Sequence, residues 1–224
     1  MYTIEAKFVK KYIDMKKVLA LLVAIFLSGS SFAQQKLSFT ISNSELKLPI
    51  TFELKANDIF AVINEISKDS VCIIGFSDGA YTAYKVASMY PQKVKKLVAI
   101  GAGEQIPGLR KVVFSGEAFE TNNDFWKKKL SIMPEPNRIK EFWRSMENFY
   151  NSMSASKALF NSIKCPVLLL AGENDKNALL PSVINAYNMI PNSQLSIIPN
   201  TGHVVFMENF PAVWASIVLF LNKI

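Results

Sequence analysis

The sequence predicts an α/β fold in which a mostly parallel sheet is covered by helices on both faces. Four short apolar segments have the length and composition of buried parallel strands, and they span 71–74, 97–100, 166–171 and 195–198. Segments whose apolar residues have helical spacing separate these runs along the chain. Strands that alternate with helices in this way are typical of parallel sheets.

Length and composition exclude several other classes of protein. The chain has 224 residues, which suits one domain of ordinary size. Half of the residues are hydrophobic and 16 are phenylalanine, so a large core can form and a disordered chain is excluded. A single histidine and two distant cysteines exclude a zinc finger or a site with several histidine ligands.

The N-terminal part has the pattern of a secretory signal peptide. Lysines at 16–17 precede an unbroken apolar run over 18–27, and Ser31 and Ala33 suit cleavage before Gln34. The apolar run is short for a membrane span. The alternatives are an uncleaved N-terminal anchor and a buried helix. We expect a secreted or periplasmic protein, with membrane contact only if the signal stays uncleaved.

Cleavage would leave a mature domain over 34–224. Residues 1–33 hold five lysines and two acids, so their removal lowers the formal net charge from +7 to +4. The dense basic run 127–129 fits the solvent-exposed face of a helix better than a surface that binds the phosphates of a nucleic acid, so we expect no nucleic-acid partner. Residues 1–14 fit poorly ahead of a signal, which leaves Met15 as the start or an extended positive region.

Local patterns assign the elements of the mature domain. In chain order we expect a strand over 34–42, a helix over 54–66, the strand 71–74, a helix over 77–90, the strand 97–100, helices within 104–163, the strand 166–171, a helix over 179–189, the strand 195–198 and a helix from Pro211. The insertion 104–163 is rich in aromatic and charged side chains, and we expect it to form a small helical cap.

A Gly-x-Ser-x-Gly motif, Gly75 to Gly79, lies between the first buried strand and a helix rich in small residues. This context predicts a nucleophile elbow, where a sharp turn projects the hydroxyl of Ser77 out of the sheet. The helix N-terminus and the amide of Asp78 would then face a developing oxyanion. The alternative is a plain turn bounded by glycines.

A serine hydroxyl needs a base, and His203 is the one histidine of the chain. His203 follows the strand 195–198, and Asp175 follows the strand 166–171. Because parallel strands end on the same side of a sheet, we expect both side chains to lie near Ser77. Glu173 remains an alternative for the acid that orients the histidine.

The segments GFSDG, PVLLLAGEND and PNTGH, in this order, resemble the α/β-hydrolase superfamily over 54–224. GFSDG is most similar to the capped esterase and lactonase branch, which includes valacyclovir hydrolase-like and enol-lactone hydrolase-like proteins. The resemblance implies hydrolysis of a small ester, lactone or amide through Ser77 as nucleophile, Asp175 as orienting acid and His203 as base. It implies no metal or organic cofactor and does not address the oligomeric state.

Three aromatic residues are candidates for the substrate pocket. Phe76 lies inside the elbow, and Trp126 and Trp143 belong to the expected cap. Packing of the cap onto the sheet is the alternative role for the two tryptophans. Cys72 and Cys165 are expected to be buried free thiols.

The sequence departs from the family's pattern ahead of the elbow. The family normally has about four strands there and a His-Gly loop that gives a second oxyanion donor. No His-Gly precedes Ser77, and 34–54 has room for one or two strands. We therefore expect the N-terminal strands to be partly missing and the elbow strand to be an exposed edge. This departure leaves two alternatives open: a slow hydrolase, or a truncated non-catalytic remnant that binds a ligand.

Overall fold

The computed structural model describes residues 50–113, 124–132 and 136–222. The expected signal peptide 1–33 and the expected strand 34–42 lie outside these residues, so both stay predictions. Among the helices within the described ranges, none is long and apolar enough to cross a membrane.

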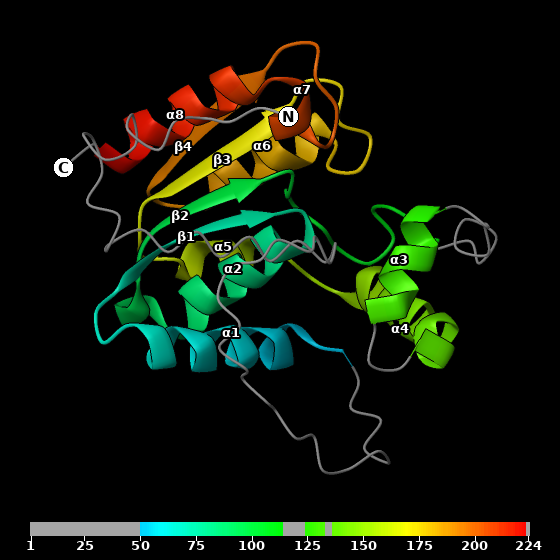
Figure 1. Cartoon of the computed structure of the whole chain (residues 1–224). Helices are drawn as coiled ribbons and strands as arrows, with labels where there is room; N and C mark the ends of the chain where they lie inside the picture. Colours follow the sequence, from blue (N-terminus) through cyan, green and yellow to red (C-terminus); the bar gives the residue numbers. More distant parts are fainter. Residues whose placement is uncertain (1–49, 114–123, 133–135, 223–224) are drawn as a thin grey trace, which may run out of the picture. The chain divides into compact units, whose positions relative to one another are not determined.

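Four parallel strands form the sheet, in the order β1-β2-β3-β4 (Figure 1). They are β1 (Val71–Phe76), β2 (Val94–Ile100), β3 (Val167–Gly172) and β4 (Ser193–Ile198). The register places Val98 beside both Ile74 and Leu168. The four buried strands predicted from the sequence are confirmed, and each is as long as expected or slightly longer. Because they are parallel, their carboxyl ends lie along one edge of the sheet.

Helices cover both faces of this sheet, as the sequence predicts (Figure 1). One face is covered by α8 (Phe210–Asn222). The apolar cluster on this side comprises Ile74, Phe76, Val98, Ile100, Leu168, Leu170, Ile198, Val205, Val213, Ile217 and Phe220. The strand members are spaced two residues apart, as alternation along a strand requires. Full burial of each large aliphatic side chain contributes about 1.5–3 kcal/mol to stability.

The opposite face packs against α2 (Asp78–Met89) and α6 (Leu180–Met189), with α1 (Phe52–Ile66) and α5 (Lys157–Ser162) against α2. Small residues make the close approach of α2 possible, since Ala80, Ala83 and Ala87 are all buried. The short 3₁₀ helix η2 (Pro91–Lys93) follows α2 because proline cannot continue an α-helix. A helical turn that the sequence did not predict, α7 (Val205–Glu208), precedes α8.

The elbow strand β1 lies at the edge of the sheet within the described residues, but it is not exposed. All six of its residues are buried. Ile74 and Phe76 join the cluster on the α8 side, while α2 packs against the other face. Within the described residues β1 is therefore an edge strand, as expected, but packing on both faces leaves its side chains little exposed to solvent.

The chain divides into two compact units. The sheet unit contains residues 52–105 and 154–222, and the second unit contains the described residues between 106 and 153. The second unit is helical, with α3 (Asp124–Ile132), the 3₁₀ helix η4 (Pro136–Arg138) and α4 (Ile139–Ser152). The insertion expected over 104–163 thus contains helices, as expected, although residues 104–113 are not helical and α5 belongs to the sheet unit.

The two ends of the insertion are joined by backbone hydrogen bonds within the sheet unit. Gln105 N donates to Ala155 O over 3.0 Å, and Ala155 N donates to Gln105 O over 2.7 Å. Inside the second unit, the Asn151 side chain accepts from Val112 N over 2.9 Å and donates to Val112 O over 2.8 Å. These contacts hold the segment that leaves the sheet beside the segment that returns to it.

The two cysteines are buried free thiols, as the sequence predicts. Burial raises the pKa of the Cys165 thiol to about 11, from an ordinary value of 9.0. The folded protein therefore holds this proton where the unfolded chain has lost it. We expect the free energy of unfolding to fall as the pH rises from about 9 to 11, by up to about 3 kcal/mol.

Urea unfolding of the wild type and of Cys165→Ala across this pH range measures the effect. The substitution should flatten the alkaline decline, whatever it does to stability at neutral pH. Equal slopes for the two proteins would contradict the assignment of the decline to Cys165. Burial also raises the pKa of Cys72, so Cys72→Ala should flatten part of the decline as well and is measured for comparison.

Candidate active site

Ser77 sits in a sharp turn between the end of β1 and the start of α2. Its backbone has φ 52° and ψ −117°, a left-handed conformation that is rare for a residue with a side chain. The Ser77 amide donates to Ile100 O over 2.8 Å, which fixes the turn to β2. Such a strained residue persists only where the surroundings hold it, and strain of this kind gathers at functional sites.

Gly75 is required for this turn. A Cβ atom on Gly75 would lie 2.6 Å from Gly79 O and 2.7 Å from Ala80 Cα, both in the first turn of α2. Backbone atoms cannot move aside cheaply, so a side chain here would push the helix away from the strand. Gly75 therefore allows the close approach of β1 and α2 that places Ser77 at the carboxyl end of β1.

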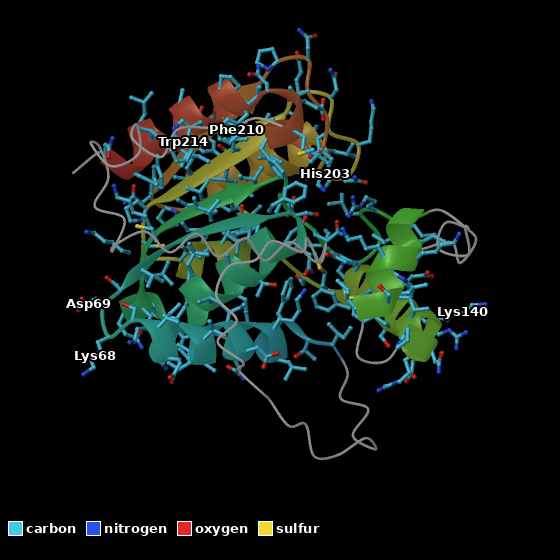
Figure 2. The ribbon with its side chains drawn as sticks, in the orientation of Figure 1. Lys68, Asp69, Lys140, His203, Phe210 and Trp214 are labelled. Atoms are coloured by element: carbon cyan, nitrogen blue, oxygen red, sulfur yellow. The ribbon has the colours of Figure 1, made fainter. Side chains whose placement is uncertain are left out.

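The structure brings Ser77, His203 and Asp175 together. His203 Nε2 lies 3.0 Å from Ser77 Oγ, and His203 Nδ1 lies 2.8 Å from Asp175 Oδ2. His203 comes from the loop after β4, beyond the carboxyl ends of the strands (Figure 2). Because an ionised carboxylate only accepts hydrogen bonds, Nδ1 donates to Asp175. Nε2 then carries the lone pair that can accept the hydroxyl proton of Ser77.

The Asp175 carboxylate is buried and held on both oxygens. Its side chain is fully shielded from solvent, while that of His203 is 17% exposed. Oδ1 accepts hydrogen bonds from Asn177 N over 2.7 Å and Ala178 N over 2.8 Å. The remaining oxygen, Oδ2, is thereby aimed at His203. A carboxylate fixed in this way sets the orientation of the imidazole ring.

The other two acids near this edge hold the histidine loop instead. Glu173 Oε2 accepts from Asn200 N over 2.9 Å, and Glu208 Oε2 accepts from Gly202 N over 2.8 Å. Asn200 has a positive φ of 58°, a conformation that asparagine adopts more readily than most residues. Of the acids considered from the sequence, Asp175 is therefore the one that contacts His203.

The hydrogen bond between Gly202 N and Glu208 predicts that different substitutions at Glu208 lower stability and turnover to different extents. Glu208→Ala removes the acceptor of the Gly202 amide, so we expect a loss of about 1 kcal/mol in stability and a severalfold fall in turnover. Glu208→Gln keeps an acceptor oxygen and should stay near the wild-type rate. Steady-state kinetics and urea unfolding of both variants measure this. Identical kinetics for Glu208→Ala and the wild type would contradict a role in holding the loop.

The predicted aromatic residues have different surroundings. The Phe76 ring packs against the His203 ring at a centroid distance of 4.9 Å and meets Phe206 edge-on at 5.0 Å. Trp143 lies in α4 and meets Phe142 edge-on at 5.3 Å. The side chain of Trp126 lies outside the described part. Substrate binding by Phe76, Trp126 and Trp143 therefore stays a prediction, and Phe76 contacts the His203 ring.

Two further residues of this edge were not found from the sequence. Gly101 has φ 64°, and a Cβ atom there would lie 3.1 Å from His203 Cε1. Its place directly after β2, at the carboxyl edge, was an available signal. Lys55 forms an ion pair with Asp78, and nothing in the spacing of α1 indicated it. Within the described ranges, no group of three or more histidine, cysteine, aspartate or glutamate residues could hold a metal ion.

A parallel sheet with a strained serine elbow and a neighbouring histidine at its carboxyl edge defines the α/β-hydrolase fold class. Comparison with known proteins agrees with this fold class and identifies a family within it. Residues 50–224 match the family described as BAAT / Acyl-CoA thioester hydrolase C terminal, and the chain belongs to this family. Hydrolysis of esters and lactones is supported at the level of the family and its relatives.

Known hydrolases resemble the chain over most of its length. It is 25% identical over 198 residues to the pimeloyl-[acyl-carrier protein] methyl ester esterase of Wigglesworthia glossinidia brevipalpis, covering 73% of this chain and 76% of the esterase. A meta-cleavage product hydrolase from Pseudomonas fluorescens superposes with a TM-score of 0.64 at 17% identity, covering 80% and 75%. The enol-lactonase of Burkholderia xenovorans gives 0.60 at 14% identity, covering 78% and 74%.

Proposed function

We propose that this chain is a serine hydrolase that cleaves a small ester, lactone or amide through an acyl-enzyme. The observation that carries the proposal is the continuous hydrogen-bonded chain from Ser77 Oγ through His203 to Asp175, at 3.0 and 2.8 Å. This is the arrangement in which a base activates a serine and an acid orients the base. The strained backbone of Ser77 supports the same role.

The proposed reaction has two halves. Ser77 Oγ attacks the carbonyl carbon while its proton passes to His203 Nε2, and the tetrahedral oxyanion accepts a hydrogen bond from the Asp78 amide. The intermediate then expels the alcohol or amine, which takes the proton from His203. A water molecule attacks the acyl-enzyme with His203 again as base, which releases the acid and restores Ser77.

The substrate class follows from this chemistry and from the named relatives. An esterase of an acyl-carrier-protein methyl ester, a meta-cleavage product hydrolase and an enol-lactonase are among the similar proteins. The family description adds an acyl thioester. The compounds in these names share an electrophilic carbonyl group that a nucleophile can attack. We propose the same class for this chain, with Phe76, Trp126 and Trp143 as candidate pocket residues.

The second candidate function is that of a non-catalytic binding protein. It is favoured by one feature: the only histidine of the chain is His203, so no His-Gly loop precedes Ser77 to give a second oxyanion donor. Loss of one such donor typically costs about 10²- to 10³-fold in rate. A complete Ser77–His203–Asp175 arrangement favours the slow hydrolase over the binding protein.

Labelling with a fluorophosphonate separates the two candidates. We expect the wild-type protein to be labelled, and Ser77→Ala and His203→Ala to remain unlabelled. Ser154→Ala is a matched control, because Ser154 is an exposed serine whose hydroxyl lies 3.2 Å from the hydroxyl of Ser156. A folded wild-type protein that is not labelled would support the binding protein and contradict the hydrolase.

We also propose that the hydrolase acts outside the cytoplasm. The positive residues at 16–17, the apolar run 18–27 and the small residues before Gln34 support export. N-terminal sequencing of protein recovered from the periplasm or the medium tests this, with Gln34 expected as the first residue. Recovery of the whole chain from the cytoplasm would contradict export.

A further inference from the structure

A buried ion pair joins α1 to the residue that follows Ser77. The Lys55 ammonium contacts Asp78 Oδ1, and the two side chains are 15% and 8% exposed. Burial lowers the pKa of Lys55, although the charge and hydrogen bond of Asp78 oppose this shift. Both groups have lost most of their hydration, and a buried pair contributes little net stability compared with apolar packing.

Other contacts also pack α1 against α2. Glu53 Oε1 and Lys85 Nζ form a second ion pair between the helices at 2.6 Å. Farther along, the Phe60 and Tyr90 rings stack at a centroid distance of 3.7 Å. Because these contacts also hold the helix, the Lys55–Asp78 pair can serve a purpose besides packing.

The place of Asp78 makes its charge important for chemistry at Ser77. Only Cα and Cβ separate the carboxyl carbon from the amide nitrogen of the same residue, so the carboxylate lies within about 5 Å of that amide. The Asp78 amide is the group proposed to donate to the oxyanion. An uncompensated carboxylate at this distance would disfavour a second negative charge by about 10²-fold in rate at the effective dielectric of a protein site.

We propose that Lys55 is a positioning residue for catalysis, which pairs with and orients Asp78 so that the Asp78 carboxylate adds no uncompensated negative charge beside the oxyanion. This inference rests on the proposed function. It assigns to α1 an electrostatic role in the reaction, although α1 contributes none of the three reacting side chains. Lys55 acts through Asp78, and its removal should slow formation of the tetrahedral intermediate more than it weakens substrate binding.

The test compares fluorophosphonate labelling rates and p-nitrophenyl acetate kinetics, both corrected for the folded fraction from urea unfolding. We expect Lys55→Met to lower kcat and the labelling rate about 10- to 100-fold, with KM changed less than threefold. Lys55→Arg keeps the charge and should recover most of the rate. The double variant Lys55→Met with Asp78→Asn removes both charges and should be faster than Lys55→Met alone.

Lys85→Met is the matched control, because it breaks the other ion pair between α1 and α2. It should lower stability slightly and leave the labelling rate within about twofold of the wild type. A labelled wild type with equal rates for folded Lys55→Met overturns this inference alone. A double variant no faster than Lys55→Met also overturns it. A folded wild type without labelling overturns the proposed function and this inference together.

Discussion

Replacing His203 with alanine is expected to lower the rate of ester hydrolysis about 10⁴- to 10⁶-fold. The chain holds no other histidine, so no second imidazole can accept the proton of Ser77. The initial rate with p-nitrophenyl acetate, measured at equal concentrations of folded protein, gives the ratio directly.

Asp175→Asn is compared with His203→Ala to show how much of the rate depends on the acid that orients the histidine. An amide at this position can donate to Nδ1 and so stabilise the wrong tautomer, and about 10⁴-fold is lost when such a change is made in a serine triad. The combination of His203→Ala with Asp175→Asn should be no slower than His203→Ala alone, because the residues act as a unit. Additive losses, or wild-type activity in His203→Ala, would contradict this account of the site.

Replacing Gly172 with alanine is expected to disrupt the fold of the active-site edge. A Cβ atom on Gly172 would lie 2.1 Å from Gly202 O and 2.5 Å from Thr201 O, both in the loop that carries His203. Neither the end of β3 nor this loop can yield without breaking hydrogen bonds. We expect a loss of at least about 3 kcal/mol in the free energy of unfolding.

Gly108→Ala is the matched control for the Gly172 variant. Gly108 has a φ of 84°, but a Cβ atom there would meet no atom within 4 Å. Only the backbone preference is lost, at about 1–2 kcal/mol. Urea unfolding followed by circular dichroism measures both variants. Equal stability of the Gly172→Ala variant and the wild type would contradict the close contact between Gly172 and the loop that carries His203.

Much of this site follows from local sequence. The elbow is predictable because Gly75, Ser77 and Gly79 stand directly between an apolar strand and a helix with small residues. Asp175 and His203 follow other strands, and the parallel sheet brings their loops to one edge. Chain order and strand ends therefore sufficed to predict these three residues.

Other features could not be predicted in this way because they depend on packing between distant segments. Lys55 meets Asp78 through the packing of α1 on α2, and the space around Gly101 and Gly172 is limited by atoms of the histidine loop. The burial of β1 was missed for the same reason, since its exposure depends on what packs on each face. Glu173 is distinguished from Asp175 by its contacts: Asp175 Oδ2 contacts His203 Nδ1, whereas Glu173 accepts from Asn200 N.

The most direct test of the central claim is to trap the acyl group on the protein. The wild type is mixed rapidly with p-nitrophenyl acetate, quenched in acid and digested, and the modified peptide is sequenced by mass spectrometry. We predict a transient acetyl group on Ser77 that forms and decays at rates consistent with turnover. Release of product without an acyl group on Ser77, or with one on another residue, would contradict the claim that Ser77 is the nucleophile.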